Sequence, residues 1–308
     1  MGRTVGFSID CRMLAFLAAA ALAGPRLVLV GDTGEDTAIG KLVSAQLVKE
    51  MATADWLLAL GDFYYDAPPI DDKACATLLA ERYRNFYAGI SPRKVIPVLG
   101  NHDVTTTAQD GFSPAARACS VAAFELLGWS KGEYPSAVRK VDKSGVQVDL
   151  AVVDAGFYGA GAPKPSLTFR PSAWRFYAAH YTWRTTAGKC EEQDKIPVGW
   201  LGTPPMDLWL NGHAHHLDAV MVDSVLALTS GSGMEMRKPK VCPDVTSQFT
   251  YTQDDGPPVG GYLVVDVVSA SALRVTPTIC AESGCAAKPA IECTRVEKGH
   301  GVSCAPAG

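Results

Sequence analysis

Five short polar segments, each placed directly after an apolar run, constrain the fold of this chain more than any other feature. The apolar runs have the length and composition of buried strands, and the polar residues begin where each run ends. The segments are Gly31-Asp32-Thr33-Gly34, Gly61-Asp62-Phe63-Tyr64-Tyr65, Gly100-Asn101-His102-Asp103, Ala179-His180-Tyr181 and Gly212-His213-Ala214-His215. Open α/β sheets form their ligand crevices at the carboxyl ends of strands, so we expect the five segments to converge on one site.

The order of the remaining patterns predicts an α/β fold. Amphipathic stretches at 36–51 and 73–87 separate apolar runs at 27–30, 56–60 and 95–99, which is the order of a βαβα arrangement. Further strands are predicted at 137–141, 147–153, 176–179 and 208–210, the first two joined by a turn at 142–145. Short β-branched runs at 219–222, 225–228, 262–268 and 272–278 predict a second, largely antiparallel sheet. Residues 231–258 are polar and irregular, and are predicted to form a long surface loop.

The charge balance argues against nucleic acid as a dedicated partner. The chain has 308 residues, with Lys+Arg 28 against Asp+Glu 32, and it contains no long basic run. An electrostatic footprint for a polyanionic polymer needs such a run or patch. The 47% hydrophobic content is sufficient for a substantial core.

Residues 1–23 have the pattern of a secretory signal peptide. Arg3 and Arg12 precede an apolar stretch at 13–23, and the small residues Ala21 and Ala23 offer a cleavage site. A helix needs about 20 apolar residues to span a bilayer, so no stable membrane span is predicted. We therefore expect a secreted or periplasmic protein, with an uncleaved anchor or a buried helix as the alternatives.

The cysteines support an extracytoplasmic location. Removal of Cys11 with the signal peptide leaves an even number, and an even number suits disulfides outside the cytoplasm: Cys75, Cys119, Cys190, Cys242, Cys280, Cys285, Cys293 and Cys304. The spacing does not fix the pairing. Free buried thiols and a zinc site near the C-terminus are less favoured alternatives. Residues 280–308 form a predicted Cys-rich tail that disulfides would hold in place.

The residue types in the five segments suit a pair of metal ions. Asp32 and Asp62 offer carboxylate oxygens and Asn101 offers a neutral oxygen, while His180, His213 and His215 offer imidazole nitrogens. Mixed oxygen and nitrogen donors suit Fe, Zn or Mn. One carboxylate can bridge two metals about 3.5–4 Å apart, and such a pair clamps the attacking and leaving oxygens in phosphoryl transfer. A small phosphate ester is the predicted substrate.

Together the segments resemble the signature of calcineurin-like metallophosphoesterases, and Tyr65 narrows the resemblance to purple acid phosphatases of the small, tartrate-resistant type. The likeness runs from about residue 27 to residue 268. It implies an α/β fold in which helices flank a two-sheet β-sandwich built from βαβαβ halves. The corresponding metallophosphoesterase domain is predicted to span residues 24–279.

The resemblance also implies a role for each residue of the site. Asp32, Tyr65 and His215 would bind a ferric ion, and Asn101, His180 and His213 would bind a divalent ion, which is Zn, Fe or Mn. Asp62 would bridge the two. A metal-bound hydroxide would then attack the phosphomonoester. His102 would contact the phosphate or protonate the leaving group, Asp103 would orient His102, and His216 is an alternative acid.

The chain departs from the family near the fourth segment. Thr182 and Trp183 follow Tyr181 where relatives usually have proline, and only 25 residues separate Asp154 from His180. These departures suggest a more open site, which favours a phosphodiesterase or nucleotidase as the alternative activity. A non-catalytic phosphate-binding protein is less favoured, because the set of ligands is complete.

Overall fold

The structure is a computed structural model that describes residues 24–66, 74–105, 112–129, 136–154, 167–190, 206–238, 240–242, 245–254, 256–296 and 300–307. The predicted signal peptide, residues 1–23, lies outside these residues. No helix among the described residues is long and apolar enough to cross a membrane.

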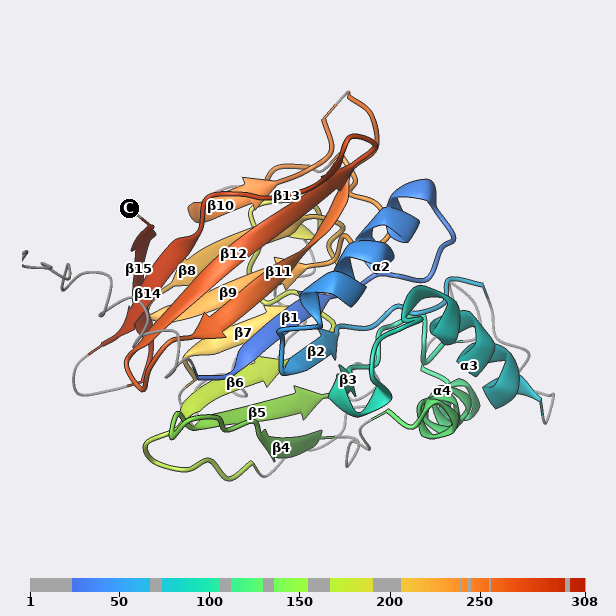
Figure 1. Cartoon of the computed structure of the whole chain (residues 1–308), viewed down its shortest axis with the longest axis horizontal. Coiled ribbons are helices and arrows are strands. Elements are labelled where there is room, and N and C mark those ends of the chain that lie inside the picture. Colours follow the sequence, from blue (N-terminus) through green and yellow to red (C-terminus); the bar gives the residue numbers. More distant parts are fainter. Residues whose placement is uncertain are drawn as a thin grey trace, which may run out of the picture.

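Two β-sheets pack face to face, and three helices cover the outer face of the first sheet (Figure 1). The strand order in the first sheet is β15 (Val302–Pro306), β14 (Ile291–Arg295), β12 (Ala272–Ala281), β11 (Gly260–Val267), β1 (Arg26–Val30), β2 (Trp56–Ala59) and β3 (Val95–Pro97), and β13 (Gly284–Ala287) pairs with β12. In the second sheet the order is β10 (Ser247–Tyr251), β8 (Leu217–Val222), β9 (Val225–Ser230), β7 (Leu208–Asn211), β6 (Trp174–Ala178), β5 (Val148–Val153) and β4 (Ser136–Lys140). The predicted α/β sandwich is therefore confirmed.

Alternation along β1 shows how the sequence builds these layers. Leu27 and Leu29 face the second sheet in the main core, whereas Val28 and Val30 face the helices. Successive strand residues point to opposite faces, so an unbroken apolar run predicts a strand that is buried on both sides. β1 and β2 run parallel to each other, and so do β2 and β3.

The helices lie where sequence signals place them, with one addition. α2 (Ala38–Glu50) begins after Thr37, whose hydroxyl accepts a hydrogen bond from the backbone N–H of Gly40 at 2.8 Å. α3 (Cys75–Phe86) corresponds to the second predicted amphipathic stretch. α4 (Pro114–Leu127) was not predicted, although it has a Ser113 cap, a proline in its first turn and the left-handed Gly128 at its end.

Two sequence predictions about the strands after residue 217 are wrong. The four β-branched runs do not make a sheet of their own, because β8 and β9 extend the second sheet while β11 and β12 pair beside β1 in the first. β1 pairs with β2 on one side and β7 pairs with β6 on one side, so each has a second edge whose backbone groups need a partner. β11 pairs with this edge of β1, and β9 pairs with that of β7. The predicted loop at 231–258 contains β10, and its Met234 and Met236 are buried.

The C-terminal residues continue the first sheet. β14 pairs with β12, and β15 pairs with β14. Asp207 fastens this part to the second sheet, because its buried carboxylate accepts hydrogen bonds from Arg295 at 2.7 Å and from the backbone N–H of Gly301 at 2.6 Å. The predicted boundary at residue 279 falls within β12, and the division into a domain and a tail stays a prediction.

Four disulfides pair the eight cysteines that the sequence analysis singled out. The pairs are Cys75–Cys119, Cys190–Cys242, Cys280–Cys285 and Cys293–Cys304. The alternatives of free thiols and of a zinc site near the C-terminus are thus excluded for these residues. Such a disulfide content is typical of proteins in an oxidising environment.

Candidate metal centre

The five polar segments converge where the parallel strands of both sheets end. They follow β1, β2 and β3 in the first sheet and β6 and β7 in the second. Hydrogen bonds join the segments within each sheet: the backbone N–H of Asp32 donates to the carbonyl of Gly61 at 2.9 Å, and that of Gly212 donates to the carbonyl of His180 at 3.1 Å. Between the sheets, the backbone N–H of His213 donates to the carboxylate of Asp32 at 2.8 Å. The predicted convergence is therefore present in the fold.

Four predicted ligands meet around the Nε2 atom of His180. This nitrogen lies 3.1 Å from Asn101 Oδ1, 3.1 Å from His213 Nδ1 and 3.2 Å from Asp62 Oδ2. His180, Asp62 and His213 are buried and form a group whose donor atoms could hold one metal ion. We call these four residues the first cluster.

The other three predicted ligands form a second cluster. The hydroxyl of Tyr65 lies 3.2 Å from Asp32 Oδ1 and 3.3 Å from His215 Nε2, and the last two atoms are 3.2 Å apart. Asp32 is fully buried, whereas Tyr65 is half-buried at the surface of the site. The neighbours His213 and His215 thus point into different clusters.

The spacing of donor atoms in both clusters fits a bound metal. Oxygen and nitrogen ligands lie about 2.0–2.2 Å from a zinc ion, which separates adjacent ligand atoms by about 3.0–3.5 Å. The distances within the clusters, 3.1–3.3 Å, fall in this range. Each cluster mixes carboxylate or neutral oxygen with imidazole nitrogen, as iron, zinc and manganese sites do.

Three of the predicted ligands have strained backbones. Asp32, Asp62 and His213 have φ values of 58°, 55° and 68°, in the left-handed region that non-glycine residues seldom occupy. Such a conformation costs on the order of 1–3 kcal/mol and persists only where the surroundings enforce it. Here the chain turns sharply at each strand end and aims the side chain back into the site. Strain of this kind clusters at functional sites in proteins, which agrees with the prediction that these residues are ligands.

Two glycines permit the close approach of the ligand segments. A Cβ atom on Gly212 would lie 2.7 Å from Asp32 Oδ2 and 2.7 Å from the carbonyl oxygen of Leu60. A Cβ atom on Gly100 would overlap the backbone nitrogen and the carboxylate of Asp62. Backbone and rigid side chains cannot move away, so glycine is required at both positions.

A second layer of hydrogen bonds holds the ligands in place. The Nδ1 atom of His180 lies 2.7 Å from the carbonyl oxygen of Leu60, which turns Nε2 toward the first cluster. The carboxylate of Asp103 accepts from the backbone N–H groups of Asp62, Phe63 and Gly100 at 2.8, 2.9 and 2.7 Å. In this structure Asp103 thus holds two ligand segments together, which is a different contact from the predicted orientation of His102.

Burial and neighbouring charges shift the pKa values of the ionisable side chains in the site. Burial alone would lower the pKa of His180, but the carboxylate of Asp62 outweighs it and the pKa rises to about 9. Burial raises the pKa of Asp103 to about 7, with a further contribution from the charge of Asp62. Burial and then the charges of Asp32 and Asp62 raise the pKa of Tyr65, against the opposing charge of Arg237. Clustered perturbations of this kind are typical of functional sites.

The two predicted acids lie in different surroundings. His102 is half-buried at the surface, its ring centroid is 4.6 Å from that of Tyr65, and its backbone N–H donates to Asp62 at 3.0 Å. His216 is 1% exposed, and its Nε2 atom lies 2.8 Å from the hydroxyl of Thr185 in a buried network with Asp218. The His102 side chain is thus accessible from solvent, whereas the His216 side chain is engaged within the protein.

Sequence reasoning did not single out Arg237, which also borders the site. Its backbone N–H donates to the carbonyl of His215 at 2.8 Å, and its side chain is exposed. The signal in the sequence is the short basic stretch that begins there, within the predicted surface loop at 231–258.

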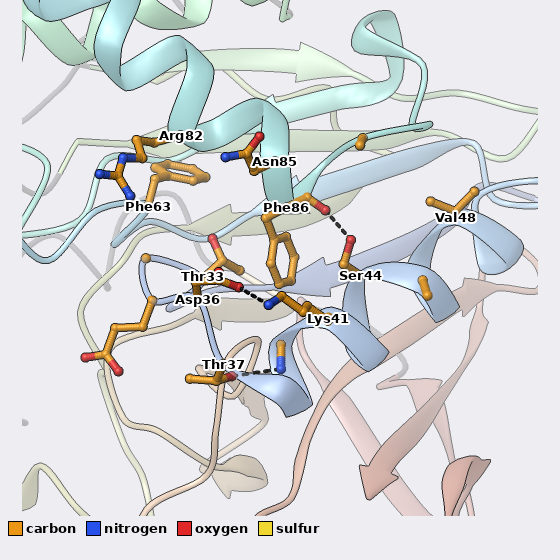
Figure 2. Close-up of a pocket in the computed structure, with 15 residues that line it drawn as sticks. Thr33, Asp36, Thr37, Lys41, Ser44, Val48, Phe63, Arg82, Asn85 and Phe86 are labelled. Carbon is orange, nitrogen blue, oxygen red and sulfur yellow. Dashed lines mark hydrogen bonds and ion pairs between the residues drawn. The ribbon is translucent and has the colours of Figure 1, made fainter. Parts of the chain in front are cut away.

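A cavity of about 430 Å³ lies on the helical side of the ligand segments (Figure 2). Thr33 and Phe63, which directly follow Asp32 and Asp62, line it together with residues of α2 and α3. Ser44 on α2 donates a hydrogen bond to the carbonyl of Phe86 at 2.5 Å, and Lys41 pairs with Asp36 at 3.0 Å. None of the seven predicted metal ligands lines this cavity.

Comparisons with known proteins place this geometry in context. A family model of calcineurin-like phosphoesterases matches residues 25–217. A purple acid phosphatase, PPD1, from yellow lupin (Lupinus luteus) seeds is similar in structure with a TM-score of 0.55 and 15% identity, over 82% of this chain and 51% of the lupin chain. This chain therefore spans about half the length of the lupin protein.

A second similar structure is GAP50, the anchor in the inner membrane complex of Plasmodium. It has a TM-score of 0.54 and 11% identity, over 93% of this chain and 89% of GAP50. No curated protein sequence matches the chain. At these identities the two structures establish a shared fold.

Proposed function

Because the chain belongs to the calcineurin-like phosphoesterase family, we propose that it is an acid phosphatase that hydrolyses phosphomonoesters at a centre of one ferric and one divalent ion. The observation that carries the proposal is the convergence of seven donor side chains into two adjacent clusters, one of which contains the phenol of Tyr65. Phenolate is a ligand suited to ferric iron, so the presence of Tyr65 favours a pair of one ferric and one divalent ion over a pair of two divalent ions.

In this proposal the two clusters hold different ions. Asp32, Tyr65 and His215 would hold the ferric ion, and Asn101, His180 and His213 would hold the divalent ion, which is Zn, Fe or Mn. Asp62 would bridge them. The distance of 3.2 Å between Asp62 Oδ2 and His180 Nε2 supports a contact of Asp62 with the ion of the first cluster, and its bridging role follows from the family resemblance.

The remaining residues of the site contribute binding and proton transfer. When bound, the two ions would supply Lewis acidity toward the phosphoryl oxygens and would activate water. His102, half-buried beside Tyr65, would contact the phosphate or donate a proton to the leaving oxygen. Asp103 would keep the segments of Asp62 and Asn101 in register through its backbone hydrogen bonds.

The fold alone leaves a non-catalytic role open, since GAP50 is described as an anchor. Retention of all seven donors, the strained backbones of Asp32, Asp62 and His213, and the surface position of His102 favour catalysis in this chain. None of these features would be needed for the sandwich fold. The four disulfides, together with the predicted signal peptide, support a secreted or periplasmic location.

The decisive experiment measures hydrolysis of an aryl phosphate from pH 4 to 9 by the purified protein after reconstitution with iron and zinc. Asp62→Ala is the matched control, because it removes the predicted bridging carboxylate. We expect the wild-type protein to hydrolyse the substrate with an optimum below pH 7 and to bind one ferric and one divalent ion per chain. The variant should lose both the turnover and the bound metal. Bound metal without turnover would favour the phosphate-binding alternative, and faster turnover of an aryl phosphodiester would favour the diesterase.

A further inference from the structure

The loop that carries His213 and His215 also carries a third histidine, His216. Residues 212–216, here called the ligand loop, connect β7 to β8. His213 points into the first cluster and His215 into the second. His216 is buried, and its Nε2 atom lies near Thr185 and Asp218. A side chain held in this way calls for a role other than proton transfer to a substrate.

A buried hydroxyl holds the imidazole of His216. The Nε2 atom lies 2.8 Å from Oγ1 of Thr185, which is fully buried. This hydroxyl has one proton and two further neighbours, the carboxylate of Asp218 at 3.2 Å and the carbonyl of Ala187 at 3.0 Å. Both neighbours only accept hydrogen bonds, so the hydroxyl donates to one of them and accepts from the N–H at Nε2 of His216. The orientation of the imidazole is thereby set.

Asp218 in turn fixes the position of Thr185. Its fully buried carboxylate, on β8, accepts hydrogen bonds from the backbone N–H and the hydroxyl of Thr186 at 2.7 and 2.8 Å. The hydroxyl of Thr250 on β10 donates to the same carboxylate at 3.0 Å. A buried carboxylate that moved would lose all of these bonds at once, so Asp218 is a rigid support for the hydroxyl beside it.

The segment that contains Thr185 is fixed at both ends. It begins directly after His180, a predicted ligand in the first cluster, and the disulfide Cys190–Cys242 closes it. Within it, the carbonyl of Thr186 accepts a hydrogen bond from the backbone N–H of Cys242 at 2.7 Å. Thr185 therefore joins the segment of one predicted ligand to the loop that carries two others.

The contacts of His216 restrain His215, because the two residues are adjacent in the chain. A rotation of the backbone that swung His215 out of the second cluster would withdraw His216 from Thr185 and leave buried polar groups unpaired. The ligand loop needs such support, since His213 has a φ of 68° and this strained conformation persists only where the surroundings enforce it.

We propose that Thr185 and Asp218 are positioning residues of the metal centre, which act through His216 to hold the ligand loop in its metal-binding conformation. This inference rests on the proposed function and adds residues that act on its metal centre without contacting the ions. Partners of metal-ligating histidines typically contribute about 10- to 100-fold to metal affinity. Thr185 and Asp218 act through one further residue, so we expect an effect of about tenfold.

Two substitutions at residue 185 separate the hydroxyl from the size of the side chain. Thr185→Val removes the hydroxyl at nearly constant volume, whereas Thr185→Ser retains it. The dissociation constant for Zn²⁺, measured by competition with a chromophoric chelator, should rise about tenfold in Thr185→Val and stay within about twofold of the wild type in Thr185→Ser. Asp218→Asn should also raise it about tenfold, because its amide group would face donors that now meet a carboxylate oxygen.

The iron-loaded protein supplies a readout that a loss of stability alone would not move. A phenolate on ferric iron should give a visible charge-transfer band, and His215 lies in the same cluster as Tyr65. Displacement of His215 should therefore shift the band in folded Thr185→Val, and Thr185→Ser should restore the wild-type position. Asp207→Asn is the matched control, because Asp207 is also a fully buried carboxylate but precedes β7, at the opposite end from the ligand loop. It should lower stability in urea unfolding without altering the Zn²⁺ affinity or the band.

The outcomes distinguish this inference from the proposed function. Thr185→Val and Asp218→Asn proteins with wild-type Zn²⁺ affinity and an unshifted band would overturn the inference, and so would a Thr185→Ser protein as weak as Thr185→Val. Hydrolysis of an aryl phosphate by the wild type would in both cases still support the proposed function. Weaker Zn²⁺ binding by Thr185→Val, in a protein whose wild type hydrolyses no phosphate ester, would support the positioning role and overturn the proposed function. A wild-type protein that bound no metal would overturn both.

Discussion

Asp103 provides the sharpest test of how the metal centre is held together. Its carboxylate is 2% exposed and accepts three backbone hydrogen bonds, from Asp62, Phe63 and Gly100. Two of these donors belong to the segment after β2, and the third belongs to the segment after β3. Asp103→Ala would leave three buried N–H groups without this acceptor.

The expected magnitude follows from these contacts. A buried N–H group that loses its partner costs about 1–3 kcal/mol, so for three such groups we expect Asp103→Ala to lower the free energy of unfolding by about 3–9 kcal/mol. At about 2 °C per kcal/mol this corresponds to a Tm lower by about 6–18 °C. Asp103→Asn keeps one oxygen, which can accept from Asp62 and Gly100 while its amide faces Phe63. Its expected cost is therefore smaller, about 1–3 kcal/mol.

Urea unfolding of the wild type and both variants measures these differences, and metal analysis of each purified protein measures the effect on the centre. Asp266→Ala is a suitable control: this aspartate forms a partly exposed ion pair with Arg26 and lies away from the ligand segments, so it should cost about 1 kcal/mol or less. If Asp103→Ala were as mild as this control and bound metal normally, the three hydrogen bonds would not hold the centre together.

Three further predictions concern the metal, the C-terminal strands and the disulfides. Tyr65→Phe should abolish the visible charge-transfer band of the iron-loaded protein without unfolding it, and a band that survived in the absorption spectrum would contradict the assignment of Tyr65 as a ferric ligand. Asp207→Ala should lower the free energy of unfolding by about 3–5 kcal/mol, because Arg295, whose side chain is 14% exposed, would keep its charge without the 2.7 Å partner; a change in Tm below about 2 °C would refute this. Replacement of both Cys293 and Cys304 by serine should cost about 2–3 kcal/mol in urea unfolding, since the disulfide closes a loop with a sequence separation of 11, and a cost equal to that of conservative surface substitutions would show that β15 is held by other contacts.

The sequence predicted the convergence of the five segments better than the pairing of the strands, because the two depend on different information. Each ligand segment is local: an apolar strand, a glycine and a polar residue are adjacent in the chain, and parallel strands bring their ends together. The pairing of β11 with β1 joins residues more than two hundred positions apart, and nothing in the short run at 260–267 specifies that partner. The strand pattern of β8, β9, β11 and β12 was therefore recognised while their assignment to sheets was wrong.

Roles that depend on side-chain direction were also beyond the sequence. His102 and His216 each adjoin a predicted ligand, and both were candidates for the acid. The structure buries His216 against Thr185 and leaves His102 half-exposed beside Tyr65. Asp103 adjoins His102 in the chain but turns its carboxylate to the backbone of Asp62 and Gly100. Adjacency in sequence thus did not determine which neighbour each side chain contacts.

The geometry of the clusters explains why the fold and the chemistry can be altered separately. The left-handed conformations of Asp32, Asp62 and His213 oppose folding, and so does the burial of Asp103, which raises the pKa of its carboxyl to about 7. Stability must come from elsewhere, and the apolar core between the sheets is its main source. We therefore expect replacement of a predicted ligand to leave the sandwich intact, whereas replacement of Asp103, which fastens the segments to each other, should affect stability and metal binding together.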